Sequence, residues 1–191
     1  KHDELYVLAD EIYEHINYVG HHESIAQFPG MKERTIVVNG VSKAYAMTGW
    51  RIGYCCAPRH LVSAMSAYQS QATSNANSIA QHAAAAALDG DQSCVTEMVA
   101  EFDRRRHIIV DGINSIPGIS CLMPEGAFYV MMNIQQLMGR RFNGRMIENS
   151  MDFAELLLAE KQVAVVPGIA FEAEGFCRMS YAVSAETIAE G

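Results

Sequence analysis

Three short apolar runs occupy the first 56 residues, and they constrain the fold more than any other feature of the chain. They are residues 5–9, which lead into Asp10, residues 35–38 and residues 52–56. Runs of four or five apolar residues are typical of strands buried in a parallel sheet. We therefore expect a mostly parallel sheet, with Asp10 at the carboxyl end of its first strand and residues 15–34 as a polar connection.

Helical patterns follow these strands. The segments are residues 59–71, 77–88 and 95–113. The first begins after a proline, the second is rich in alanine and stops at Gly90, and the third has apolar residues at helical spacing. In the third helix we expect residues 104–106, three consecutive arginines, to form a solvated face. Strands followed by helices predict the α/β class, and residues 1–116 are assigned to a larger α/β domain.

After residue 116 the pattern changes to shorter elements, so residues 117–191 are assigned to a small α+β domain. Strands are expected over residues 119–123, 127–134, 163–166 and 177–182, and a helix over residues 153–160. Residues 139–150 are polar and contain glycine, which favours an exposed loop. The chain ends just as residues 184–187 begin a helix, so this domain is expected to be truncated at its end.

Composition excludes several classes of partner. With 14 basic and 22 acidic residues the net charge is −8, and no basic stripe is present, which argues against nucleic acid and anionic membranes. No apolar run approaches the roughly 20 residues of a membrane span. The five cysteines lack zinc-ligand spacing, Cys55 and Cys56 are expected to be buried strand thiols, and the adjacent His21 and His22 a solvated loop. We expect a reduced, cytoplasmic protein without a metal.

Candidate chemistry concentrates around Lys43. The segment from residue 39 reads NGVSKAYAMTGWRIG, in which an apolar run and a small-residue turn precede the lysine. A lysine held at a strand end among small residues can approach a planar cofactor, and Arg51 supplies a planar fork that matches a phosphate. Taken alone, a solvated loop lysine and a surface arginine would explain the same residues.

Residues 40–53 resemble the cofactor-attachment signature of the class I and II (fold type I) aminotransferases, most closely the aspartate-aminotransferase type. The resemblance implies that Lys43 binds pyridoxal 5'-phosphate as a Schiff base and shuttles protons, and that Arg51 binds the cofactor phosphate. One position departs from the pattern. Many relatives have a phosphate-binding serine three residues before the lysine, where this chain has Gly40.

The same resemblance gives roles to three further residues. Asp10 would pair with the ring nitrogen of the cofactor and Tyr13 would donate a hydrogen bond to the ring oxygen. Arg178, on the otherwise apolar run 175–182, would bind the α-carboxylate of the substrate. On physical grounds alone, a protein carboxylate such as Glu172 or Glu174 is an alternative partner for this arginine, because an interior guanidinium requires an anion.

The function implied by the resemblance is transamination between an amino acid and a 2-oxo acid, by a homodimer when the protein is full length. Residues 70–74 resemble a segment that reaches the neighbouring subunit's site. Two alternatives remain open: another reaction of the same fold, such as a β-lyase, and a non-catalytic sensor domain of a transcription regulator. The chain resembles only the C-terminal half of the family, so by itself we expect it to be weakly active or inactive.

Overall fold

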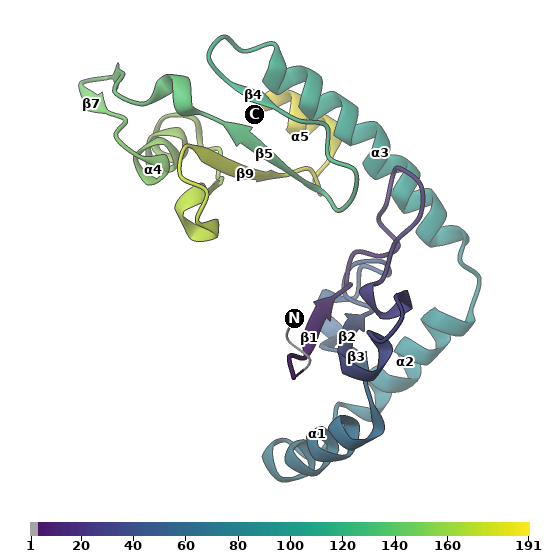
Figure 1. Cartoon of the computed structure of the whole chain (residues 1–191). Helices are drawn as coiled ribbons and strands as arrows, with labels where there is room; N and C mark the ends of the chain where they lie inside the picture. Colours follow the sequence, from purple (N-terminus) through teal and green to yellow (C-terminus); the bar gives the residue numbers. More distant parts are fainter. Residues whose placement is uncertain (1–3) are drawn as a thin grey trace. The chain divides into compact units, whose positions relative to one another are not determined.

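The computed structural model describes residues 4–191, which form two compact units (Figure 1). The first unit extends to Val99 and the second covers Ala100–Gly191. The division falls within helix α3 (Ser93–Asn114), upstream of residue 117, where the sequence pattern changes. No helix among the described residues is both long enough and apolar enough to cross a membrane.

The first unit contains a three-stranded sheet in the order β1-β2-β3. Its strands are β1 (Val7–Asp10), β2 (Thr35–Gly40) and β3 (Gly53–Cys56). β1 and β2 are parallel, but β3 is antiparallel to β2, so the expected mostly parallel sheet is a mixed one. The reason is that the chain returns through the 3-10 helix η3 (Thr48–Trp50) and enters β3 at the edge where β2 ends, with Gly40 opposite Gly53.

Burial in this sheet is lower than the apolar runs predict. Leu8 in β1 is 71% exposed, and both Cys55 and Cys56 in β3 are exposed, so the prediction of buried thiols is wrong. β1 and β3 are the two edge strands, whereas the central strand β2 buries Thr35 and Asn39. An apolar run indicates that a segment is a strand, but it does not indicate whether the strand is central or at an edge of the sheet.

The helices agree with the sequence patterns. They are α1 (Arg59–Ala72), α2 (Ser78–Asp89) and α3. Asn77 caps α2, because its side-chain oxygen accepts a hydrogen bond of 3.1 Å from the backbone N–H of Ala80. The core of the unit lies between α2 and the segment after β2, and consists of Val41, Ile52, Ala80 and Ala84, with Tyr45 and Met47 packed against it. The residues around Lys43 are therefore anchored in the core.

The second unit has a four-stranded antiparallel sheet in the order β4-β5-β9-β8. Its elements are β4 (Ser120–Cys121), β5 (Tyr129–Asn133), β8 (Val166–Pro167), β9 (Phe176–Ser180), and the helices α4 (Ser150–Lys161) and α5 (Ala185–Glu190). The segment expected to be an exposed loop instead contains a hairpin of β6 (Arg141–Phe142) and β7 (Arg145–Met146), and buries Ile147 and Ser150.

The three consecutive arginines of α3 do not share one solvated face. Arg104 is exposed and pairs with Glu101, but Arg106 is only 6% exposed, and its Nη1 donates a hydrogen bond of 2.6 Å to the carbonyl oxygen of Pro124. Successive residues of a helix point about 100° apart, so three in a row span about 200° of the helix, and here that arc reaches the side that packs against the Pro124 turn. The prediction is therefore wrong for Arg106, which ties α3 to the turn before β5.

Candidate active site

Lys43 lies just beyond the carboxyl end of β2, between two buried neighbours. Val41 is fully buried and Ala44 is 3% exposed, whereas Lys43 itself is half-buried. Its Nζ lies 5.8 Å from the centre of the Tyr13 ring. The packing of the flanking residues fixes the lysine backbone, and the amine lies beside an aromatic ring at the edge of the sheet.

Asp10 and Tyr13 lie on a tight turn at the same edge. Asp10 is the last residue of β1, opposite Val38, and its Oδ1 accepts a hydrogen bond of 3.2 Å from the N–H of Ile12. The N–H of Ile16 donates to the carbonyl oxygen of Tyr13 over 2.9 Å, and the Ile16 side chain is fully buried. This turn therefore leads directly from the strand end to the tyrosine ring beside Lys43.

Arg51 follows η3 and precedes β3, again at this edge. Its backbone is left-handed, with φ 56° and ψ 48°, and its Nη1 donates a hydrogen bond of 3.0 Å to the carbonyl oxygen of Thr48. Ala46 and Ser74 are also left-handed, with φ of 52° and 64°. Such conformations cost on the order of 1–3 kcal/mol each, and they cluster where function constrains the backbone.

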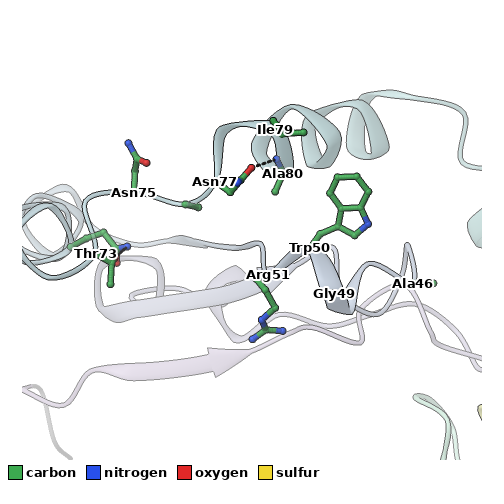
Figure 2. A pocket seen from close by; sticks show the side chains of 11 residues that line it. Ala46, Gly49, Trp50, Arg51, Thr73, Asn75, Asn77, Ile79 and Ala80 are labelled. Carbon is green, nitrogen blue, oxygen red and sulfur yellow. Dashed lines mark hydrogen bonds between the residues drawn. The ribbon is translucent and has the colours of Figure 1, made fainter.

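A cavity of about 920 Å³ opens beside Arg51 (Figure 2). Its wall includes Trp50, Thr73, Asn75 and Asn77, so it joins the end of η3 to the segment between α1 and α2. Figure 2 shows the side chains of Trp50 and Arg51 pointing away from each other. Among the described residues that line this cavity, Arg51 is the one cation, and it is exposed.

Gly40, the position that departs from the serine pattern, leaves little room for a side chain. A Cβ there would lie 3.0 Å from the carbonyl oxygen of Ile52, 3.2 Å from the Cα of Gly53 and 3.3 Å from the Cδ1 of Ile12. Two of these neighbours are backbone atoms of the segment paired with β2. The close approach of two chain segments therefore favours glycine, because a Cβ would force these neighbours to shift by a few tenths of an ångström.

Tyr45 adds a neutral hydroxyl near this edge. Its Oη donates a hydrogen bond of 2.8 Å to Oε1 of Gln92, and its ring makes an edge contact with His15. Burial, and then the nearby Cys94 and Glu14, raise the pKa of Tyr45 above its ordinary value, although the hydrogen bond to Gln92 acts in the opposite direction. The phenol therefore keeps its proton at neutral pH.

A cluster that the sequence did not reveal lies next to the Asp10 turn. Nε2 of His22 is 3.0 Å from Oε2 of Glu11, and potential ligand atoms of Glu11, Glu14 and His22 lie within 4.8 Å of one another. The sequence predicts a solvated loop for the histidine pair, and both His21 and His22 are exposed. The eleven-residue separation of His22 from Glu11 gives no periodic signal, and only the course of the loop brings them together.

Arg178 belongs to the second unit, in the middle of the sheet. It lies opposite Met131 of β5 on one side and Val166 of β8 on the other. Its guanidinium carbon is 4.3 Å from the centre of the Tyr129 ring and 4.5 Å from that of Phe171. Within residues 4–191 no carboxylate forms an ion pair with this arginine.

The two glutamates considered as partners of Arg178 do not pair with it. Glu174 instead accepts hydrogen bonds from the backbone N–H and Oγ of Ser150, at 2.5 and 3.0 Å, and from the N–H of Gly175. Partial loss of hydration favours the neutral acid although Glu174 is exposed, but these three hydrogen bonds outweigh that effect and lower the pKa of Glu174 below its ordinary value. Glu174 thus holds the start of α4.

Four of the expected site residues therefore lie at one edge of the first sheet. Asp10, Lys43 and Arg51 follow or precede the strand ends there, and Tyr13 contacts the lysine. Their side chains provide an amine, a carboxylate, a phenol and a guanidinium. Arg178 provides a second guanidinium, within the other unit.

Comparisons with known proteins show similarity to aminotransferases over the whole chain. The family model described as aminotransferase class I and II matches residues 1–191. An aspartate/prephenate aminotransferase of Nitrosomonas europaea is 46% identical over 194 residues, covering 100% of this chain and 49% of that protein. An aspartate aminotransferase of Rhizobium meliloti is 48% identical over 193 residues, covering 100% of this chain and 47% of that protein.

Solved structures show the same similarity. The aspartate aminotransferase from Rhizobium meliloti has a TM-score of 0.95 and 47% identity, covering 99% of this chain and 48% of that one. An aromatic aminotransferase from Pyrococcus horikoshii has a TM-score of 0.89 and 41% identity, covering 98% of this chain and 49% of that one. The chain thus spans about half the length of the relatives that it matches.

Proposed function

This chain belongs to the class I and II aminotransferases, and on that premise we propose that the protein transfers an amino group between an amino acid and a 2-oxo acid with pyridoxal 5'-phosphate as cofactor. The observation that carries the proposal is the meeting of Asp10, Tyr13, Lys43 and Arg51 at one sheet edge. A homodimer, and a division into domains at residues 116 and 117, are parts of the same proposal.

The donor set at this edge fits the cofactor. Lys43 would hold it covalently, Asp10 would pair with its ring nitrogen, Tyr13 would donate to its ring oxygen and Arg51 would bind its phosphate. Residue 40 contributes no side-chain ligand for the phosphate, because it is a glycine, and a Cβ there would be crowded by two backbone atoms. When bound, the cofactor supplies an electron sink that stabilises negative charge at the substrate Cα.

Each residue of the chain then has one task. The Nζ of Lys43 would take the proton from the substrate Cα as a general base and would deliver it to a carbon of the bound cofactor as a general acid. The carboxylate of Asp10 keeps the ring nitrogen protonated. Tyr13 holds a hydrogen bond at the ring oxygen, and Arg51 anchors the phosphate with a charge-assisted bond.

Arg178 would bind the substrate α-carboxylate. The rings of Tyr129 and Phe171 lie within 4.5 Å of the guanidinium carbon, so aromatic surface occupies the space beside the guanidinium while its N–H groups remain the hydrogen-bonding edge. A carboxylate fits that edge with two parallel hydrogen bonds. Because Glu174 is engaged with Ser150, the arginine does not have to exchange a protein carboxylate for the substrate.

The substitution Lys43→Ala in the full-length protein tests the cofactor assignment. The absorbance of the lysine-linked cofactor should disappear, because the substitution removes the Nζ that would form the link. Lys32→Ala, which removes an exposed lysine of the 3-10 helix η2 (Lys32–Arg34), is the matched control and should keep the absorbance. An unchanged spectrum of the Lys43 variant would refute the assignment.

The substitution Arg178→Ala tests the carboxylate site. Loss of a hydrogen-bonded charge pair costs about 2–5 kcal/mol, so KM for amino acids should rise by roughly 30-fold or more while cofactor affinity changes little. Arg145→Ala, which removes an exposed arginine of the same unit, should leave KM unchanged. Equal losses of cofactor and substrate affinity would contradict the assigned role. Ammonia release without a 2-oxo acid acceptor would favour the lyase alternative.

A further inference from the structure

Glu11 is a buried carboxylate between two proposed cofactor ligands, Asp10 and Tyr13. It is only 9% exposed. Its Oε1 accepts a hydrogen bond of 2.6 Å from Oγ of Ser24, and its Oε2 lies 3.0 Å from Nε2 of His22. A buried charge is retained only where partners satisfy it, so these two contacts are the condition for keeping Glu11 in place.

The contacts of Glu11 join three pieces of chain. Its backbone N–H donates to the carbonyl oxygen of Val38 over 2.8 Å, which extends the pairing of β1 and β2 by one residue. Its carbonyl accepts from the N–H of Glu14 over 3.0 Å, within the turn that carries Tyr13. Through its side chain it binds Ser24, the residue that caps the 3-10 helix η1 (Ile25–Gln27).

We propose that Glu11 is a positioning residue, which through Ser24 and His22 fixes Asp10 and Tyr13 relative to Lys43. The inference rests on the proposed function, because it concerns the same cofactor site. The physical reason is the short chain separation. Asp10 directly precedes Glu11 and Tyr13 is two residues later, and Nζ of Lys43 lies 5.8 Å from the centre of the Tyr13 ring. A turn held at Glu11 by both its backbone and its side chain cannot rotate without moving both ligands.

The charged surroundings bear on any change at Glu11. Glu14 and His22 lie beside it, and His15 lies 3.2 Å from Oε1 of Glu14. Replacing Glu11 with glutamine keeps its size but puts a neutral amide where Ser24 and His22 meet a carboxylate. The amide nitrogen donates but cannot accept, so one of the two contacts must reverse its hydrogen-bond direction, and both lose the negative charge of the acceptor.

The test uses the full-length protein with bound cofactor and three variants: Glu11→Gln, Ser24→Ala and, as a control, the exposed Glu23→Gln from the same loop. The first readout is the pH midpoint at which the absorbance of the lysine-linked cofactor changes, which reports the hydrogen bonds that Asp10 and Tyr13 make. The second is the separation of kcat from KM, and the third is thermal stability without substrate.

We expect Glu11→Gln to shift the spectral midpoint by about half a pH unit or more and to lower kcat by roughly 10-fold or more, with KM changed by less than about 3-fold, because small misplacements of catalytic groups have effects of this size. Ser24→Ala should shift the midpoint in the same direction by a smaller amount, and Glu23→Gln should match the wild type. The serine variant also serves if the glutamine variant does not fold.

The proposal is overturned if Glu11→Gln, or Ser24→Ala where the first variant does not fold, has the midpoint of the wild type. It is also overturned if thermal stability falls while the spectral midpoint, kcat and KM all stay at their wild-type values, because such a result would show a purely structural role for Glu11. A wild-type protein with no absorbance from lysine-linked cofactor would overturn the proposed function itself, and this inference with it.

Discussion

Gly40 allows a quantitative prediction about stability. Replacing it with the serine found in many relatives should lower the free energy of unfolding. The substitution Gly40→Ser would install the phosphate-binding serine that many relatives carry. Its Cβ would lie 3.0 Å from the Ile52 oxygen and 3.2 Å from the Gly53 Cα, both backbone atoms, and 3.3 Å from the Ile12 Cδ1. The end of the Ile12 side chain can move, but the backbone atoms can yield only if β3 shifts away from β2.

Overpacking of this kind costs about 1–3 kcal/mol, and the two backbone contacts place the expected loss of unfolding free energy near 2 kcal/mol. For a chain of 191 residues this corresponds to a fall in Tm of about 4–8 °C. The serine hydroxyl would thus be gained only by weakening the junction of β2 and β3 that holds Lys43.

Thermal unfolding followed by circular dichroism measures the effect. Gly112→Ser is the matched control, because a Cβ at Gly112 in α3 meets nothing within 4 Å and serine has the higher helix propensity. Its Tm should be unchanged or slightly raised. A Gly40→Ser protein whose Tm stays within about 1 °C of the wild type would refute the reasoning, and so would an equal fall in the control.

Two further predictions concern ionisable groups of the second unit. The lowered pKa of Glu174 stabilises the fold above the ordinary carboxyl pKa of about 4.3, and this contribution disappears as the pH falls through the folded-state pKa. Glu174→Gln should therefore flatten the acid limb of a stability-versus-pH curve, by less than about 1 kcal/mol because the group is exposed; a limb parallel to that of Glu172→Gln would contradict this. Burial raises the pKa of Cys177 to about 11, so iodoacetamide at pH 8 should modify the exposed Cys94 first and Cys177 only in urea, as read by peptide mass spectrometry. Equal native rates for the two thiols would refute the burial argument.

The positions of the candidate site residues at strand ends could be predicted from local sequence, whereas their roles stay predictions. The resemblance of residues 40–53 to the family is confirmed by the match over residues 1–191. The sequence also predicts the helices α1, α2 and α3, because proline, alanine content, glycine and the spacing of apolar residues are local signals. The structure adds that Tyr13 lies beside Lys43, at the edge where β1 and β2 end.

What could not be predicted depends on contacts between distant segments. The antiparallel direction of β3 is set by the turn after Lys43, and an apolar run has no direction. The burial of Arg106 depends on a carbonyl 18 residues further along, at Pro124. The pairing of Glu11 with His22 depends on the course of an irregular loop. In each case the partner lies outside the window in which periodicity can be read.

The central claim is that the amine of Lys43 holds the cofactor, and one measurement tests it directly. The full-length protein, loaded with pyridoxal 5'-phosphate, is reduced with borohydride, digested and mapped by mass spectrometry. The account predicts a single stable adduct, located on the peptide that contains Lys43. An adduct on another lysine, or none on Lys43 in a protein that retains the bound cofactor, would contradict it.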